Sequence, residues 1–264
     1  MASERANRTF LQAALAAVGL PLIALIVLPF VGLITRSSLS RIWEALLSPA
    51  VGQALVLTLF TTCIVVVCAV IAGTPLAILM STRTPSFQWL RSIIDLPTVL
   101  PPAVAGIALL SLFGRSGMFG PTLAGYGVVI PFTSAAVVLA QLFVAAPLYI
   151  RACTIALDRL DPLLADAARI DGASPWQYWW HVVYPMSKHG LHAGVAMTTA
   201  RALGEFGATA LFAGNMPGRT RTMALAIYVA ADSEPEVATA MSLVLLAIAL
   251  VLMGVTHRAP VRDV

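Results

Sequence analysis

The residues of this chain that could take part in chemistry are few, and most of them lie in one polar segment, residues 161–185. It reads DPLLADAARIDGASPWQYWWHVVYP. Asp161 followed by Pro162 predicts a helix start, since aspartate is a good N-cap and proline suits the first helical position. Ser174 and Gln177 have the spacing of a capping box. With Gly172 between these two starts, the segment is predicted to form a short helix, a turn and a second short helix.

Aromatic residues cluster on the second of these helices, and two interpretations of them stay open. Trp and Tyr gather at the headgroup level of membranes, which suits Trp179 and Trp180 because they lead into an apolar stretch. Aromatic side chains also supply much of the affinity at protein interfaces. That role suits Trp176 and the turn formed by residues 166–172.

A second candidate site lies inside an otherwise apolar stretch, where Arg201 and Glu205 are four residues apart. On one helix they would share a face, and Thr198 and Thr209 would extend it into a polar stripe. A charge at the centre of a bilayer costs at least about 2.5–3.5 kcal/mol, so both side chains are predicted to face the protein interior. The stripe either lines a translocation path, with Arg201 attracting an anion, or contains a structural ion pair.

The sequence gives no support for a nucleotide-binding, metal-binding or disulfide-bonded site. The only lysine, Lys188, stands in MSKHG, which cannot form a phosphate-binding P-loop. The four histidines lack the spacing and carboxylate partners of metal ligands, and the three cysteines offer neither a disulfide framework nor a C-x-x-C pair. We therefore expect no enzymatic activity, cofactor, metal site or nucleic-acid partner.

Composition indicates an all-α integral membrane protein. Hydrophobic residues make up 59% of the chain and charged residues 11%, against about 25% charged in soluble domains. A membrane-spanning helix needs about 20 apolar residues. The first span is too long for the apolar core of a signal peptide, about 7–15 residues, and is expected to be retained. Six spans are predicted, at 10–34, 51–80, 96–114, 132–154, 190–214 and 237–256.

Two of these assignments depend on particular residues. The third span is predicted to begin around Pro97 and the Pro101-Pro102 pair. The fifth is long enough only if Arg201 and Glu205 lie within the membrane. Residues 222–231 are too short to cross and are predicted to form an interfacial or re-entrant helix.

Basic residues predict the orientation, because they are enriched on the cytoplasmic side. With a cytoplasmic N-terminus, ten basic residues lie inside and five outside, so both termini and the 161–185 segment are expected in the cytoplasm. The inside set is Arg5, Arg8, Arg83, Arg91, Arg151, Arg159, Arg169, Lys188, Arg258 and Arg262, and the outside set is Arg36, Arg41, Arg115, Arg219 and Arg221.

The polar segment resembles the cytoplasmic loop of permeases from binding-protein-dependent ATP-binding-cassette (ABC) importers. Their signature is E-A-A, three residues, G, nine residues, then I-x-L-P. Here Asp166 replaces the glutamate, Val182 and Tyr184 replace isoleucine and leucine, and four positions match: Ala167, Ala168, Gly172 and Pro185. The resemblance implies a type I importer permease fold in a bacterial plasma membrane. It also implies a coupling helix, between spans four and five, that docks on a separate ATPase through these residues and Trp176.

A second resemblance covers residues 201–228 and is to the oxyanion branch of the same family. LGEFGA is shared by molybdate and sulfate permeases, and FAGNMPGRTRT with LAIY is closer to the molybdate permeases. It implies a dimer of this chain with the path between the copies, two ATPase subunits, and an external oxyanion-binding protein docking near Asn215, Arg219 and Arg221. A solvated loop near lipid headgroups remains an alternative for these arginines. Tungstate, sulfate or thiosulfate remain alternative cargoes, and a gradient-driven anion transporter remains an alternative class.

Overall fold

Long apolar helices form the frame of the molecule. In the computed structural model, residues 2–81 and 88–257 are described, and they are helical with no strand in these ranges. A segment in lipid must satisfy its own backbone groups, so long apolar runs fold as helices. The four that are long and apolar enough to cross a membrane, within the described ranges, are α1 (Ala2–Thr35), α3 (Pro49–Ser81), α7 (Ser134–Asp158) and α13 (Pro235–His257).

These four helices overlie the predicted spans 10–34, 51–80, 132–154 and 237–256. They establish a multi-pass membrane protein. Several charges used to predict the orientation have no described side chain, namely Arg5, Arg8, Arg83, Arg258 and Arg262.

The span predicted at 96–114 is not one continuous helix. The chain forms α4 (Gln88–Val99) and α5 (Pro102–Phe113), which meet at an angle of 113°. Pro101 and Pro102 explain the bend, because proline disfavours a helical conformation in the residue before it and donates no backbone hydrogen bond. Pro102 begins α5, whereas Pro97 is accommodated inside α4. The pair is either one broken span or a re-entrant segment.

The span predicted at 190–214 is likewise not one continuous helix. Helix α10 (Tyr184–Leu203) ends before Glu205, and α11 (Gly207–Phe212) follows a three-residue break. At the other end, α9 (Pro175–Tyr178) and a π-helical turn (Trp179–Val183) lead directly into α10, so the second helix of the polar segment is not short. Helix α10 packs against α3, α7 and α13, and its polar residues Ser187 and Thr198 are buried. The count of six spans stays a prediction.

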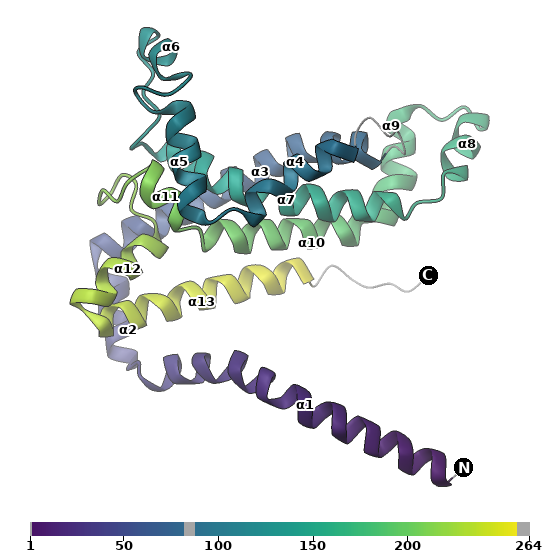
Figure 1. The fold of residues 1–264 in the computed structure, drawn as a ribbon, viewed down its shortest axis with the longest axis horizontal. Helices are drawn as coiled ribbons and strands as arrows, with labels where there is room; N and C mark the ends of the chain where they lie inside the picture. The colour runs from purple at the N-terminus through teal and green to yellow at the C-terminus, as the bar shows by residue number, and fades with distance from the viewer. Residues whose placement is uncertain (1, 82–87, 258–264) are drawn as a thin grey trace.

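Short elements lie at the two ends of this frame. Those at one end are α2 (Leu39–Leu47), α6 (Gly120–Gly125), α11 and α12 (Met223–Ser233), whereas α8 (Leu163–Ile170) and α9 lie at the other (Figure 1). Helix α12 coincides with the short helix predicted at 222–231 and, as predicted, is too short to cross. The start of α1 and the end of α13 lie on the same side as α8 (Figure 1).

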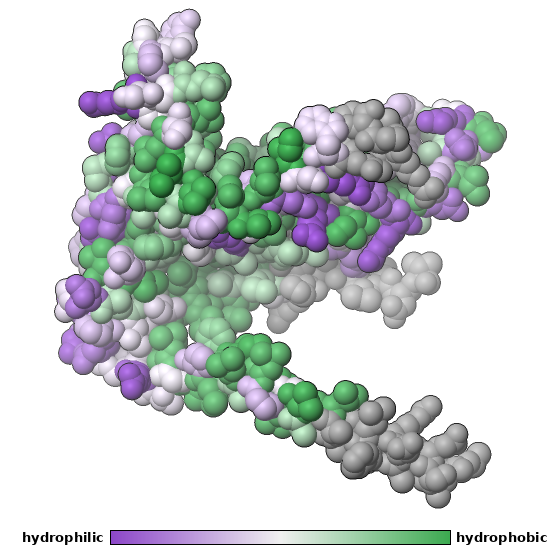
Figure 2. Space-filling model, viewed as in Figure 1, coloured by the Kyte–Doolittle hydropathy of each residue, from purple (hydrophilic) through white to green (hydrophobic). Residues whose placement is uncertain are grey.

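Helices α7 and α10 pack through small residues at four-residue spacing on α10: Gly190, Gly194, Thr198 and Ala202. A Cβ on Gly194 would lie 3.1 Å from the Tyr149 ring, and one on Gly190 would overlap Ala156 Cβ. Small residues allow such close approach of membrane helices. Helix α1, by contrast, stands apart from the bundle, and no residue of its apolar window is buried (Figures 1 and 2).

Candidate functional site

The polar segment 161–185 begins with the predicted caps. Asp161 Oδ1 accepts a hydrogen bond of 3.0 Å from the Leu163 N–H at the start of α8. Pro162 precedes the helix rather than forming its first residue. Ser174 Oγ accepts from the Gln177 N–H at 3.3 Å, and Gln177 Oε1 accepts from the Ser174 N–H at 2.8 Å. This reciprocal pair is the predicted capping box. Gly172 between the helices has φ +75°, a left-handed conformation that favours glycine.

The outer surface of this segment carries exposed apolar side chains. Trp176, which the sequence singled out, is 69% exposed. Sequence reasoning missed two others, Ile170 at 86% and Leu163 at 69% exposed. Leu163 and Ile170 are seven residues apart on α8, which places them on one helical face. This seven-residue spacing of apolar residues outside any predicted span could have indicated the exposed apolar face.

The motif residues are mostly exposed too. Asp166 and Ala167 on α8 and Pro185 at the start of α10 are exposed, whereas Ala168 is half-buried. Asp166 Oδ1 lies 3.1 Å from Arg169 Nη1, an ion pair within the helix. Polar side chains gather over this end of the molecule in Figure 2.

The tryptophans divide between the interior and the surface. Trp179 packs with the buried core formed by α3, α7 and α10. Trp176 and Trp180 stack edge to face with ring centroids 5.4 Å apart, and Trp180 in turn contacts the Tyr184 ring at 5.3 Å. Trp176 therefore stands at the tip of an aromatic column that rises from α10.

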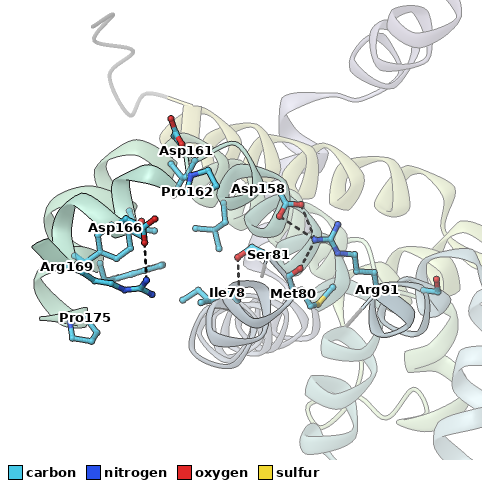
Figure 3. Close-up of a pocket in the computed structure, with 17 residues that line it drawn as sticks. Ile78, Met80, Ser81, Arg91, Asp158, Asp161, Pro162, Asp166, Arg169 and Pro175 are labelled. Atoms are coloured by element: carbon cyan, nitrogen blue, oxygen red, sulfur yellow. Dashed lines mark hydrogen bonds and ion pairs between the residues drawn. The ribbon is translucent and has the colours of Figure 1, made fainter. Parts of the chain in front are cut away.

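A cavity of about 1380 Å³ separates α8 from the cytoplasm-facing ends predicted for α3 and α7 (Figure 3). On its bundle wall, Arg91 Nη2 donates to the Met80 carbonyl at 2.6 Å and lies 3.1 Å from Asp158 Oδ2. Arg91 thus ties α4 to the ends of α3 and α7. The Asp166–Arg169 pair lies on the opposite wall (Figure 3). Sequence reasoning did not single out Arg91 or Asp158.

The second candidate site centres on the break between α10 and α11. Arg201 Nη1 lies 2.7 Å from Glu205 Oε2, although Glu205 follows the end of α10. The Glu205 side chain is 1% exposed and that of Arg201 is 33% exposed. Glu205 Oε1 also accepts a hydrogen bond of 2.9 Å from the Ala208 N–H. Glu205 therefore pairs with Arg201 and caps the start of α11.

The two threonines do not form a continuous stripe with this pair, because Thr209 belongs to α11 rather than α10. Thr198 and Thr209 are both fully buried within the chain. Thr198 Oγ1 donates to the Ala145 carbonyl of α7 at 3.3 Å. Of the four predicted path residues, only Arg201 reaches the surface of the single chain.

The loop after α11 has the turn structure that its sequence predicts, with positive φ at Gly214 and Gly218. Asn215 Oδ1 accepts a hydrogen bond of 2.8 Å from Arg221 Nε, so these two side chains brace the loop. Arg219 is exposed, and among the described residues its side chain forms no ion pair. Its carbonyl accepts from Ser134 Oγ at 2.8 Å.

Comparison with known proteins places these features in context. The sequence profile of a family described as "Binding-protein-dependent transport system inner membrane component" matches residues 67–258. The chain is 40% identical to the molybdenum transport system permease protein ModB of Mycobacterium tuberculosis, over 90% of this chain and 91% of that protein. It is 34% identical to the sulfate transport system permease protein CysT of Escherichia coli, over 83% and 80%.

Solved structures share the fold at low sequence identity. A chain of a bacterial alginate ABC transporter, crystallised with an alginate pentasaccharide-bound periplasmic protein, superposes with a TM-score of 0.74. It is 16% identical, and the match covers 96% of this chain and 94% of that one.

Proposed function

Since this chain belongs to the family of binding-protein-dependent transport system inner membrane components, we propose that it is the membrane-spanning subunit of an ATP-driven molybdate importer. The observation that supports molybdate as the cargo is the 40% identity to a molybdenum permease over nine-tenths of both chains. The sulfate permease is less similar, at 34% over a shorter region. The chain is a transport subunit, and a separate subunit hydrolyses ATP.

The 161–185 segment is proposed to dock on that ATPase. Its exposed apolar side chains support this, because Leu163, Ile170 and Trp176 stand outside the apolar helices and would be covered by a protein groove. The motif residues Asp166, Ala167, Ala168, Gly172 and Pro185 would position the segment in the groove. The cavity behind α8 separates the docking helix from the ends of α3 and α7.

Two copies of this chain are proposed to enclose the path, each bound to one ATPase subunit. Both termini and the 161–185 segment would face the cytoplasm of a bacterium. Two observations support this orientation: the ten-to-five distribution of basic residues and the position of both helix ends on the side of α8 (Figure 1).

Arg201 is proposed to attract the anion within the path. Its guanidinium is partly exposed while Glu205, its counter-ion, is buried. The carboxylate therefore moderates the positive charge without occupying the open side. Thr198 and Thr209 would support the helices around this point rather than contact the anion, since both are fully buried.

An extracytoplasmic oxyanion-binding protein is proposed to dock at the loop after α11. The Arg219 side chain, which forms no ion pair with any residue that the structure describes, suits an acidic partner surface. Asn215 and Arg221 hold the loop in shape. Selectivity for the cargo can then reside in the binding protein.

Uptake of molybdate into proteoliposomes tests the proposed function. The permease is reconstituted with an ATPase subunit and an oxyanion-binding protein from the same organism, with ATP supplied at the ATPase face. We expect uptake that requires ATP, and competition by tungstate but only weakly by sulfate. Uptake without the ATPase would indicate a gradient-driven transporter, and preferred uptake of sulfate would refute the assigned cargo.

A further inference from the structure

We propose that Gln141 on α7 is a positioning residue of the transport path. Its amide holds the break between α10 and α11 in the geometry that brings Glu205 to Arg201. The inference rests on the proposed role of Arg201 in the path. It concerns a residue that lies outside both sequence motifs and touches neither charged side chain through a hydrogen bond of its own.

The link runs through one backbone carbonyl. Helix α10 ends at Leu203, and the carbonyls of a last helical turn lack their usual amide partners. The Ala202 carbonyl accepts a hydrogen bond of 3.1 Å from Gln141 Nε2 and another of 3.2 Å from the Glu205 N–H. A carbonyl oxygen has two lone pairs. The same atom therefore connects α7 to the backbone of the residue that pairs with Arg201.

The burial of Gln141 is not explained by packing. Gln141 and Glu205 are each 1% exposed and Ala202 is fully buried. The Gln141 Oε1 atom has no hydrogen-bond partner among the described residues, and burying an unpaired polar atom costs free energy. A methionine would fill a similar volume without that cost. The hydrogen bond from Nε2 is the interaction that an apolar residue could not supply.

A second cross-helix bond fixes the register on the same face. Thr198 Oγ1 donates to the Ala145 carbonyl, one turn along both helices from the Gln141–Ala202 bond. The two bonds run in opposite directions between α7 and α10. Beyond the break, the Glu205 carboxylate accepts from the Ala208 N–H. The break is thus held on one side by Gln141 and on the other by Glu205.

The test uses two substitutions in the complete permease–ATPase complex. Gln141→Met keeps the length of the side chain and removes the donor. Gln141→Glu keeps a donor, because a carboxyl group buried in an apolar site holds its proton. Hydrogen exchange of peptides covering residues 201–209 reports on the break, and ATP-dependent molybdate uptake reports on the path.

We expect Gln141→Met to speed exchange at residues 201–209 and to slow uptake, each by about three- to tenfold, the range for a cross-helix hydrogen bond in a membrane protein. Gln141→Glu is expected to stay near wild type in both measurements. Gln141→Asn is the substitute test if the methionine variant does not assemble. Its amide is one methylene too short to reach the Ala202 carbonyl, so we expect the effects described for Gln141→Met. Unchanged exchange in Gln141→Met, or equal effects of Met and Glu, would overturn the inference.

A background without the ion pair separates positioning from packing. Arg201→Met with Glu205→Gln removes the pair, while the amide oxygen introduced at position 205 can still accept from the Ala208 N–H. If Gln141 acts through the pair, adding Gln141→Met causes no further loss of uptake in this background. The same fold loss in both backgrounds would refute positioning. Wild-type uptake by the background itself would instead refute the path role of Arg201. Hydrogen exchange at residues 201–209 would still test whether Gln141 stabilises the break.

Discussion

Arg201 and Glu205 form an ion pair with 2.7 Å between Nη1 and Oε2, although the end of α10 lies between them. Glu205 reaches back across the break with one carboxylate oxygen and caps α11 with the other. The two functions can be separated, because a neutral amide can accept the capping hydrogen bond but cannot neutralise an arginine.

Glu205→Leu is expected to destabilise the permease by about 1–3 kcal/mol or more, since it leaves the buried Ala208 N–H without its acceptor and Arg201 without its counter-ion. Glu205→Gln keeps the acceptor and should lose clearly less. Thermal unfolding of the purified complex in detergent measures both. Equal losses for Leu and Gln would show that the cap contributes nothing.

Arg201→Met is expected to lower molybdate uptake at least tenfold, while Arg201→Lys retains part of it, because the proposed contribution is positive charge at a partly exposed position. Uptake in proteoliposomes measures the effect. Exchanging the two residues is a poor test of stability, since an arginine at position 205 would face the Ala208 N–H with donors alone. If the exchanged protein nevertheless transports normally, direct contact of Arg201 with the anion is refuted.

The sequence predicted local features well where one short pattern determines the structure. The Asp161 cap, the Ser174–Gln177 capping box and the turn at Gly172 all depend on neighbouring residues, and all are present. Long uninterrupted apolar runs also predicted four long helices, because lipid leaves an apolar segment few alternatives.

The errors arose where tertiary contacts decide the structure. Composition gave no means to see that α10 ends at Leu203, since the break is held by Gln141 from a distant helix and by the Glu205 cap. Likewise, the Pro101-Pro102 pair was assigned to a helix start, which Pro102 does form, but the sharp bend from α4 was not foreseen. The pairing of Arg91 with Asp158 joins residues 67 positions apart and has no local signal.

Trp176→Ala is expected to weaken binding of the ATPase by more than tenfold, because an exposed tryptophan at an interface can contribute about 2 kcal/mol or more. Trp43→Ala is the matched control: Trp43 is similarly exposed, at 65% against 69%, but lies on α2 at the opposite end of the molecule. Titration of detergent-solubilised permease with the ATPase measures affinity. Equal effects of the two substitutions would contradict docking through Trp176.

Gly190→Ala is expected to destabilise the bundle by about 1–3 kcal/mol, since a new methyl group would overlap Ala156 Cβ where α10 packs on α7. Gly52→Ala provides the control on another long helix. A Cβ there meets no atom within 4 Å, and replacing a helical glycine by alanine otherwise stabilises by about 0.5–1 kcal/mol. Thermal unfolding should therefore move in opposite directions for the two variants. Unchanged thermal unfolding of Gly190→Ala would show that α10 and α7 can move apart at little cost in free energy.

Gly172 offers a test of the docking segment that alters no side-chain contact. Its φ is +75°, and a Cβ there would meet nothing within 4 Å. A substitution therefore acts through backbone conformation alone. Gly172→Val should disfavour the left-handed turn by about 1–2 kcal/mol, which changes the angle between α8 and α9 and weakens ATPase binding. Gly172→Asn should retain most of the affinity, because asparagine tolerates this conformation. Affinity for the ATPase, measured beside unfolding of the permease alone, separates the outcomes. Similar affinities for Val and Asn, with both permeases folded, would show that docking does not depend on the turn.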